Sequence, residues 1–257
     1  MKARTPVAAT LLALILATPL AAPLARAAEV TVFVPGAVRA VVTPLAEAYA
    51  KAHGDTIKWF AGTAGATEKR AAAGEPFDVV ITTAKGIDEL TKAGKVAAGS
   101  RADLGSMGVG VAVRTGAPKP DISTPEAFKQ SMLDAKSLMY ADPALGGQSG
   151  IHTAKVFAQL GIAEQLKPKT VLLPGAPEGL KRVAAGEIEI GIGQISEILA
   201  AKGVTLVGPF PPALQQSLTF SAGLSPKAGP AARGLVSELT GPAARERFHA
   251  AGFEIPH

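Results

Sequence analysis

The sequence predicts an α/β protein in which mostly parallel sheets are flanked by helices on both faces. Short apolar runs of strand character alternate with amphipathic helical segments along the chain. Most of these runs end in glycine, alanine or a hydroxyl residue just before a helix begins. About 230 residues follow the N-terminal leader, which is enough for one large core or two smaller lobes.

The first half contains three strand–helix units and a fourth strand. The helix after the first strand has apolar residues at helical spacing (Val38, Val41, Val42, Leu45) and ends at Gly54. Further helices are expected at about 64–73 and in the segment closed by Gly94. The expected strands are 29–35 (EVTVFVP), 56–62 (TIKWFAG), 77–83 (FDVVITT) and 107–113 (MGVGVAV).

The second half continues the alternation. Thr124 and Pro125 mark a helix start, with an N-cap hydroxyl followed by proline at the first helical position. A helix over 149–160 ends at Gly161, and 228–251 is helical, with Pro242 starting the last helix. The expected strands are 137–141, 170–174, 187–193 and 204–210.

The N-terminus has the pattern of a secretory signal peptide. Lys2 and Arg4 precede an uncharged apolar stretch, and Ala25-Arg26-Ala27 forms an A-x-A site, so cleavage is expected after Ala27. The chain has no cysteine, which excludes disulfides and a lipid anchor at the cut. We therefore expect residues 1–27 to be removed and the rest to be free in the periplasm.

The composition of the chain also limits which ligands and macromolecules it can bind. The 26 basic residues exceed the 21 acidic ones, but three of the basic residues lie in the leader, so the remainder is close to neutral. No basic run suits nucleic acid. The four histidines are not closely paired, which disfavours a zinc site, and no cofactor is expected.

The segment 140–155 (YADPALGGQSGIHTAK) is the most informative for function. Gly147 keeps the backbone bare, while Gln148, Ser149 and Gly150 begin a helix whose first N–H groups lack intrahelical partners. Such a terminus binds small anions, although an ordinary tight turn would have the same sequence. Because carboxyl ends of parallel strands meet at one edge, similar junctions should join it. They are Gly36, Ala37 and Val38; Gly62 and Thr63; Thr83; and Gln194.

The familiar enzyme motifs are missing. The sequence contains no G-x-S-x-G, H-E-x-x-H, G-x-x-x-x-G-K-[ST] or G-x-G-x-x-G. We therefore expect a protein that is not an enzyme. The alternative is a periplasmic serine-dependent enzyme, in which Ser149 is the nucleophile and His152 the base. His152 shares the polar side of its helix with Lys155 and Gln159, so we expect it in solvent or at a cleft rim.

The whole chain after the leader resembles periplasmic molybdate-binding proteins of ABC importers. The resemblance rests on TVFVPGAVRAVVTPLAEAYAKAHG, FAGTAGATEKRAAAGEPFDVVITT, ADPALGGQSGIHTAKVFAQLGI, EIEIGIGQISEI and LTGPAARERFHAAGFEI, in that order. It implies a type II periplasmic binding protein fold with a cleft between two lobes, 28–109 plus 222–257 and 110–221. It also implies a small anionic solute, a membrane permease as partner, and a monomer.

The resemblance implies an oxyanion held by serine hydroxyls and backbone N–H groups, with a tyrosine near the hinge. This sequence departs from that pattern. Ala37 replaces a serine, Gly62-Thr63-Ala64 keeps one hydroxyl, and Gln194 takes the tyrosine position. Arg39, one turn on, suits a planar carboxylate, although a solvated helix residue is an equal alternative. We therefore expect an organic di- or tricarboxylate slightly more than molybdate or tungstate.

Overall fold

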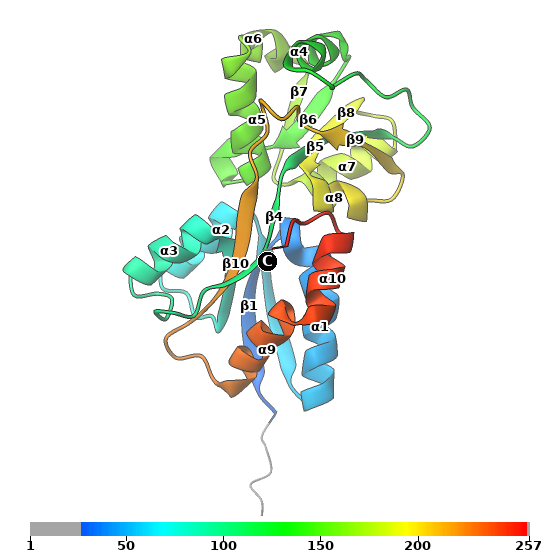
Figure 1. Cartoon of the computed structure of the whole chain (residues 1–257). Helices are drawn as coiled ribbons and strands as arrows, with labels where there is room; N and C mark the ends of the chain where they lie inside the picture. The colour runs from blue at the N-terminus through cyan, green and yellow to red at the C-terminus, as the bar shows by residue number, and fades with distance from the viewer. Residues whose placement is uncertain (1–26, 256–257) are drawn as a thin grey trace, which may run out of the picture.

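The computed structural model describes residues 27–255 and has two five-stranded sheets, each flanked by helices. The sheets form two lobes stacked one above the other (Figure 1). In each sheet the strands on one side of the central strand pair parallel with it and with each other, and those on the other side pair antiparallel. The predicted fold class is confirmed.

Lobe 1 is built on the sheet order β2-β1-β3-β10-β4. Its three N-terminal strands run parallel, and β10 returns antiparallel between β3 and β4. The strands are β1 (Glu29–Pro35), β2 (Thr56–Gly62), β3 (Val79–Thr83), β4 (Ala102–Met107) and β10 (Leu218–Leu224). The helices are α1 (Gly36–His53), α2 (Ala64–Ala72), α3 (Ala84–Lys92), α9 (Pro230–Thr240) and α10 (Pro242–Ala250).

Lobe 2 is built on the sheet order β7-β6-β8-β5-β9. The strands are β5 (Val109–Arg114), β6 (Leu138–Ala141), β7 (Thr170–Leu173), β8 (Ile190–Gln194) and β9 (Val204–Pro209). The helices are α4 (Pro125–Asp134), α5 (Gln148–Gln159), α6 (Ala163–Leu166), α7 (Ala176–Ala184) and α8 (Ile195–Ala200), with short 3₁₀ turns η1 (Pro143–Leu145) and η2 (Lys167–Lys169).

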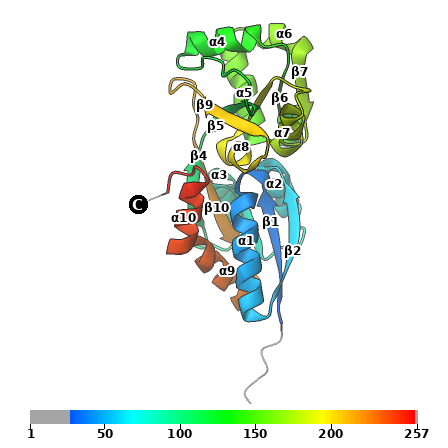
Figure 2. The same ribbon diagram turned by 90° about the vertical axis from the view of Figure 1, so that its right-hand side faces the viewer.

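The chain crosses between the lobes twice. It enters lobe 2 through Gly108, between β4 and β5, and returns through residues 210–217 into β10. Figures 1 and 2 show both connections side by side, with α8 of lobe 2 directly above the start of α1. The predicted single strand over 107–113 is therefore two strands in different sheets. The lobe limits at 109/110 and 221/222 stay a prediction.

Each lobe has its own hydrophobic core. In lobe 1, Val32 and Val34 of β1 pack with Val38 of α1 and Leu235 of α9, all fully or nearly fully buried. In lobe 2, Phe128, Phe157 and Phe210 form a cluster of aromatic rings. Among residues 27–255, the buried members of each core cluster come from one lobe, although Ile195 of α8 packs against the core of lobe 1, so the lobes are separate packing units that meet at a cleft.

The predicted signal peptide falls almost wholly on residues 1–26, outside the described part of the chain. Within residues 27–255, no helix combines the length and apolar character needed to cross a membrane.

Candidate functional site

A cavity of about 910 Å³ lies between the lobes. Its walls are the carboxyl ends of strands from both sheets and the helix starts that follow them, including Pro35 and Gly62 from lobe 1 and Ala141 and Gln194 from lobe 2. This is where open α/β sheets bind ligands.

Most of the predicted site residues meet in this cavity. Gly36, Ala37, Arg39, Gly62, Thr63, Gln148, Ser149 and Gln194 all line it. These residues come from four junctions, of which the first and the last are more than 150 positions apart in sequence, and the sheet topology brings them together.

Three predicted site residues lie outside the cavity lining. The side chain of Val38 is fully buried in the core of lobe 1. The Thr83 hydroxyl caps α3 by accepting from the Gly86 N–H, and it donates to Glu68. Gly150 lies so close to the Ala141 carbonyl that any Cβ there would overlap it. Val38 and Thr83 therefore serve packing and capping, and Gly150 allows close approach of α5 to β6.

Four helix N-termini converge on the cavity. The N-cap residues Pro35, Thr63, Gly147 and Gly175 of α1, α2, α5 and α7 all line it. Three of these helices, α1, α5 and α7, have no side-chain cap, so their first N–H groups have no side-chain acceptor. Together the four termini present positive dipole ends, and the three without a side-chain cap also offer N–H donors, which favours an anion.

Three cationic side chains add to this positive field. Arg39 of α1, Lys181 of α7 and Lys202 after α8 line the cavity from both lobes. None of the three forms an ion pair with another described residue. They remain available to an anionic ligand, and Arg39 can meet a carboxylate with two parallel hydrogen bonds.

Gln194 presents an unsatisfied amide to the cavity. Its side chain is 3% exposed, and its Oε1 has no hydrogen-bond partner in the described structure. A buried carbonyl oxygen without a partner is costly, so this position calls for a hydrogen-bond donor, such as a hydroxyl or a water molecule.

The two lobes touch through direct hydrogen bonds that span the cleft. Thr63 Oγ1 donates to the Leu145 carbonyl at 2.7 Å, and Ser196 Oγ donates to the Ala37 carbonyl at 2.5 Å. A backbone bond from Gly65 N–H to the Gly146 carbonyl spans 3.2 Å. The Thr63 hydroxyl also accepts from the Ala66 N–H, so closure and capping occupy it, and it is not free for a ligand.

Glu197 is a cavity residue that the sequence reasoning missed. It lies in the first turn of α8, lines the cavity, and accepts a hydrogen bond from the backbone N–H of Gln194. Burial among the cavity walls raises the pKa of its carboxyl to about 7, and the Gln194 bond offsets this only in part. The available signal was its position three residues after Gln194, at a predicted strand end.

The Ser149 and His152 pair does not form a catalytic dyad in this structure. His152 is 8% exposed rather than solvated, and its Nε2 donates to the Leu214 carbonyl at 2.8 Å. Its ring also packs near Phe210, and burial lowers its pKa. The expectation of a histidine in solvent or at the cleft rim was wrong, because α5 turns this face onto the 210–217 segment. No hydrogen bond joins Ser149 to His152 in the described structure.

The chain belongs to the bacterial extracellular solute-binding protein family, whose sequence model matches residues 30–254. It is 34% identical over 250 residues to a Pseudomonas protein named aconitate isomerase, covering 94% of each chain. It is 29% identical over 239 residues to the molybdate-binding protein ModA of Azotobacter vinelandii, covering 90% of this chain and 92% of that one.

A solved structure, the periplasmic molybdate-binding protein of Azotobacter vinelandii, has the same fold. It superposes with a TM-score of 0.71 at 20% identity, covering 89% of this chain and all of that one. The resemblance to periplasmic molybdate-binding proteins is therefore confirmed, and the protein is a divergent solute-binding protein of the ABC importer type.

One expectation is overturned. The sequence predicted a protein that is not an enzyme, because familiar catalytic motifs were missing. A relative that matches 94% of the chain at 34% identity is named as an isomerase, which contradicts that prediction. Motif searches detect nucleophiles, metal sites and phosphate loops, and a catalytic carboxyl in a binding cleft has no such signature.

Proposed function

We propose that this protein binds a small unsaturated tricarboxylate in the closed cleft and moves a proton on it, interconverting the isomers of aconitate. Two observations support the proposal. The cleft collects anion donors from both lobes, and the relative named aconitate isomerase matches nearly the whole chain. The main support for the proposal is the set of anion-binding donors that line the cleft.

The donors suit several separate negative charges better than one compact oxyanion. Helix N-termini and cations approach from both lobes around a cavity of about 910 Å³, which is ample for a three-carboxylate ligand. Arg39 and Lys181 stand on helices of different lobes. Each could engage a different carboxylate, with the helix termini supplying the remaining bonds.

Molybdate fits the cleft less well. Ala37 and Gln194 replace hydroxyl ligands that the resemblance implies, and the Thr63 hydroxyl is already occupied. Losing two charge-assisted donors would weaken a tetrahedral dianion by roughly 3 kcal/mol, or about a hundredfold. We therefore infer an organic carboxylate as the ligand.

The reaction needs few catalytic groups. Aconitate is propene-1,2,3-tricarboxylate, and transferring a proton from its CH₂ carbon to its vinylic CH carbon shifts the double bond along the chain. The same constitution is regenerated, and the geometry of the new double bond is set by the conformation in which the ligand is held. The enzyme must hold the three carboxylates, stabilise the charge that spreads onto them, and carry one proton.

A second candidate function is the capture of a carboxylate for import. The family membership favours it, since solute-binding proteins of this type deliver their ligand to a membrane permease. On this proposal the protein works as a periplasmic monomer, and its closed form, with ligand enclosed, is the one the permease recognises. Capture and isomerisation use the same cleft.

One experiment separates these functions. The purified protein lacking residues 1–27 is heated with cis-aconitate, trans-aconitate, citrate, tricarballylate, succinate, molybdate or tungstate. A ligand at a hundred times its Kd should add about 2.7 kcal/mol to the free energy of unfolding. In parallel, ¹H NMR follows each aconitate isomer in the presence of the protein.

We expect stabilisation by the tricarboxylates and conversion of one aconitate isomer into the other. Stabilisation without conversion would overturn the isomerase proposal and leave a receptor for import. Stabilisation by molybdate or tungstate alone would overturn the carboxylate ligand.

A further inference from the structure

We infer that Glu197 is the catalytic residue that carries the proton in this cleft. The inference rests on the proposed function, because it assigns a group to the reaction proposed above. Three observations support it: the position of the Glu197 carboxyl in the cavity, the cationic groups around it, and the poorer fit of the other ionisable side chains in the cavity.

The Glu197 carboxyl lies at the junction of the two lobes. A Cβ on Gly36, in the first turn of α1, would overlap Glu197 Oε1, and a Cβ on Gly193 would lie 3.9 Å from Oε2. The carboxyl therefore sits against bare backbone from both lobes and lines the cavity. A ligand held between the helix N-termini of lobe 1 and lobe 2 would meet it directly.

A carboxyl at this place works against anion binding. The cavity is built from positive helix ends and from Arg39, Lys181 and Lys202, yet none of these cations pairs with Glu197. An ionised carboxylate there would repel a polyanion at close range. Binding alone would be served better by an amide or a hydroxyl, so the carboxyl is most readily explained by chemistry.

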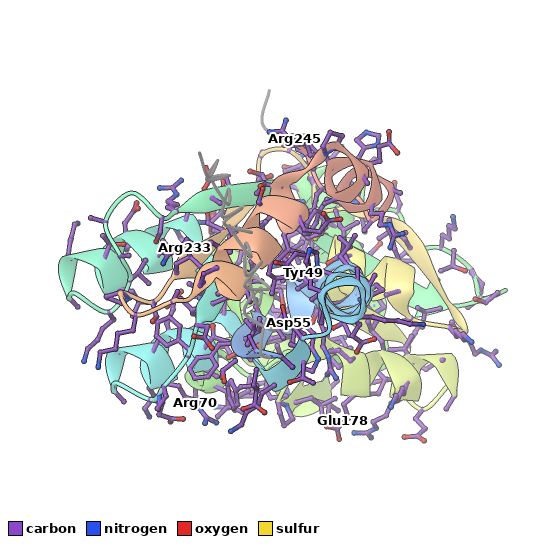
Figure 3. The ribbon with its side chains drawn as sticks, turned by 90° about the horizontal axis from the view of Figure 1, so that it is seen from below. Tyr49, Asp55, Arg70, Glu178, Arg233 and Arg245 are labelled. Carbon is purple, nitrogen blue, oxygen red and sulfur yellow. The ribbon has the colours of Figure 1, made fainter. Side chains whose placement is uncertain are left out.

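The other ionisable groups of the cavity fit the role less well. Five ionisable side chains line it, and three are the cations Arg39, Lys181 and Lys202. The remaining acid, Glu178, is exposed on α7, and Figure 3 shows it at the outer edge of the molecule. Glu197 is half-buried, and burial brings its pKa to about 7, where a carboxyl can both accept and return a proton.

The proton transfer balances without any other reactant. The ionised carboxyl of Glu197 takes a proton from the ligand's CH₂ carbon, and the C–H electron pair spreads over the three-carbon system and its carboxylates. The protonated carboxyl then gives the proton to the other terminal carbon, a new C–H bond forms, and the double bond moves. Glu197 ends ionised, as it began.

The test compares three variants with the wild-type chain lacking residues 1–27. Glu197→Gln keeps the shape and the acceptor for the Gln194 N–H but cannot carry a proton. Glu197→Asp keeps the carboxyl but shortens it, and Glu126→Gln is the matched control, at an exposed glutamate in the first turn of α4 that is not part of the cavity lining. Turnover of each aconitate isomer is measured by ¹H NMR, Kd by titration calorimetry, and folding by thermal unfolding without ligand.

We expect Glu197→Gln to lower kcat by about 10²–10⁴-fold while Kd stays the same or decreases, since a repulsive charge is removed. Glu197→Asp should recover part of the activity, and Glu126→Gln should change kcat less than threefold. Full turnover by Glu197→Gln would overturn the assignment of Glu197 and leave the proposed function intact. Absence of turnover by the wild-type protein would instead remove the proposed function.

Discussion

Glu197 of lobe 2 lies against Gly36 of lobe 1, and a Cβ at position 36 would overlap its carboxyl in this conformation. Gly36 is the first residue of α1, and Glu197 is in the first turn of α8, more than 150 residues later. The contact between these two helices spans the cleft (Figure 2). The proposed site is therefore complete only when the lobes are closed.

Adding a methyl group at Gly36 should disturb this contact. In Gly36→Ala the Cβ would displace the Glu197 carboxyl or hold the lobes apart. We expect turnover of aconitate to fall about ten- to a hundredfold, because small misplacements of a reacting group are costly. Steady-state kinetics by NMR would measure it. Gly208→Ala, whose Cβ would make only an ordinary contact with Ile122, is the control and should keep wild-type turnover.

Closure should depend on two glycines that touch across the cleft. A Cβ on Gly65 would lie 2.8 Å from the Gly146 Cα, and backbone atoms cannot rotate away. Gly65→Ala should therefore weaken ligand binding about tenfold by opposing closure. The unliganded protein should be at least as stable as wild type, because Gly65 is within α2 and alanine favours helix.

Calorimetry and thermal unfolding separate these two effects of Gly65→Ala. Small-angle scattering with saturating ligand should also give a larger radius of gyration than for wild type. Unchanged affinity in this variant would mean that the Gly65–Gly146 contact does not limit closure.

Arg39 should bind a carboxylate of the ligand. Arg39→Ala should weaken tricarboxylate binding roughly tenfold or more, the range of a charge-assisted hydrogen bond. Arg39→Lys should restore only part of it, since a lysine cannot form the two parallel bonds. Arg233→Ala, on α9 and well away from Glu178 in Figure 3, is the matched control. Equal Kd values for Arg39→Ala and Arg233→Ala would refute the role of Arg39.

The raised pKa of Glu197 predicts that the free energy of unfolding falls as pH rises. Because the pKa rises to about 7 on folding, the protonated form is favoured in the folded protein. The protonated carboxyl therefore contributes up to about 3 kcal/mol to the free energy of unfolding. This contribution is fully present below the ordinary glutamate pKa and is lost as pH rises through about 7. Urea unfolding of wild type and Glu197→Gln at pH 5 and pH 8 measures it.

The difference in unfolding free energy between Glu197→Gln and wild type should therefore grow from pH 5 to pH 8, in favour of the variant. The charged groups that share the cavity, Arg39, Glu178, Lys181 and Lys202, are present in both proteins and cancel in the comparison. A constant difference across this range would show that the Glu197 pKa is not raised. In wild type, kcat/KM should increase with pH up to about 7 as the ionised base forms.

Gly150 should matter for folding rather than for ligand binding. A Cβ there would overlap the Ala141 carbonyl, where α5 packs against β6. Gly150→Ala should lower the free energy of unfolding by about 3 kcal/mol through overpacking. Denaturant unfolding measures it, and a fully stable variant would show that α5 can shift at no cost.

The sequence predicted the main elements well where the pattern was local. The strands at 29–35 and 56–62 match β1 and β2 residue for residue, because apolar runs and flanking glycines are short-range signals. Helices α7 and α8 were not predicted as elements. Gly179 within α7 and the short length of α8 weaken a helical pattern, and packing against β8 and across the cleft stabilises the two helices.

The sequence alone determined that this chain alternates strand and helix and that anion donors follow several strand ends, because both depend on neighbouring residues. Only the tertiary structure decided which donors face each other. It placed Val38, Thr83 and Gly150 in packing or capping positions and buried His152 against the 210–217 segment. It also brought Glu197 against Gly36, since the closing of two lobes joins residues that no local pattern relates.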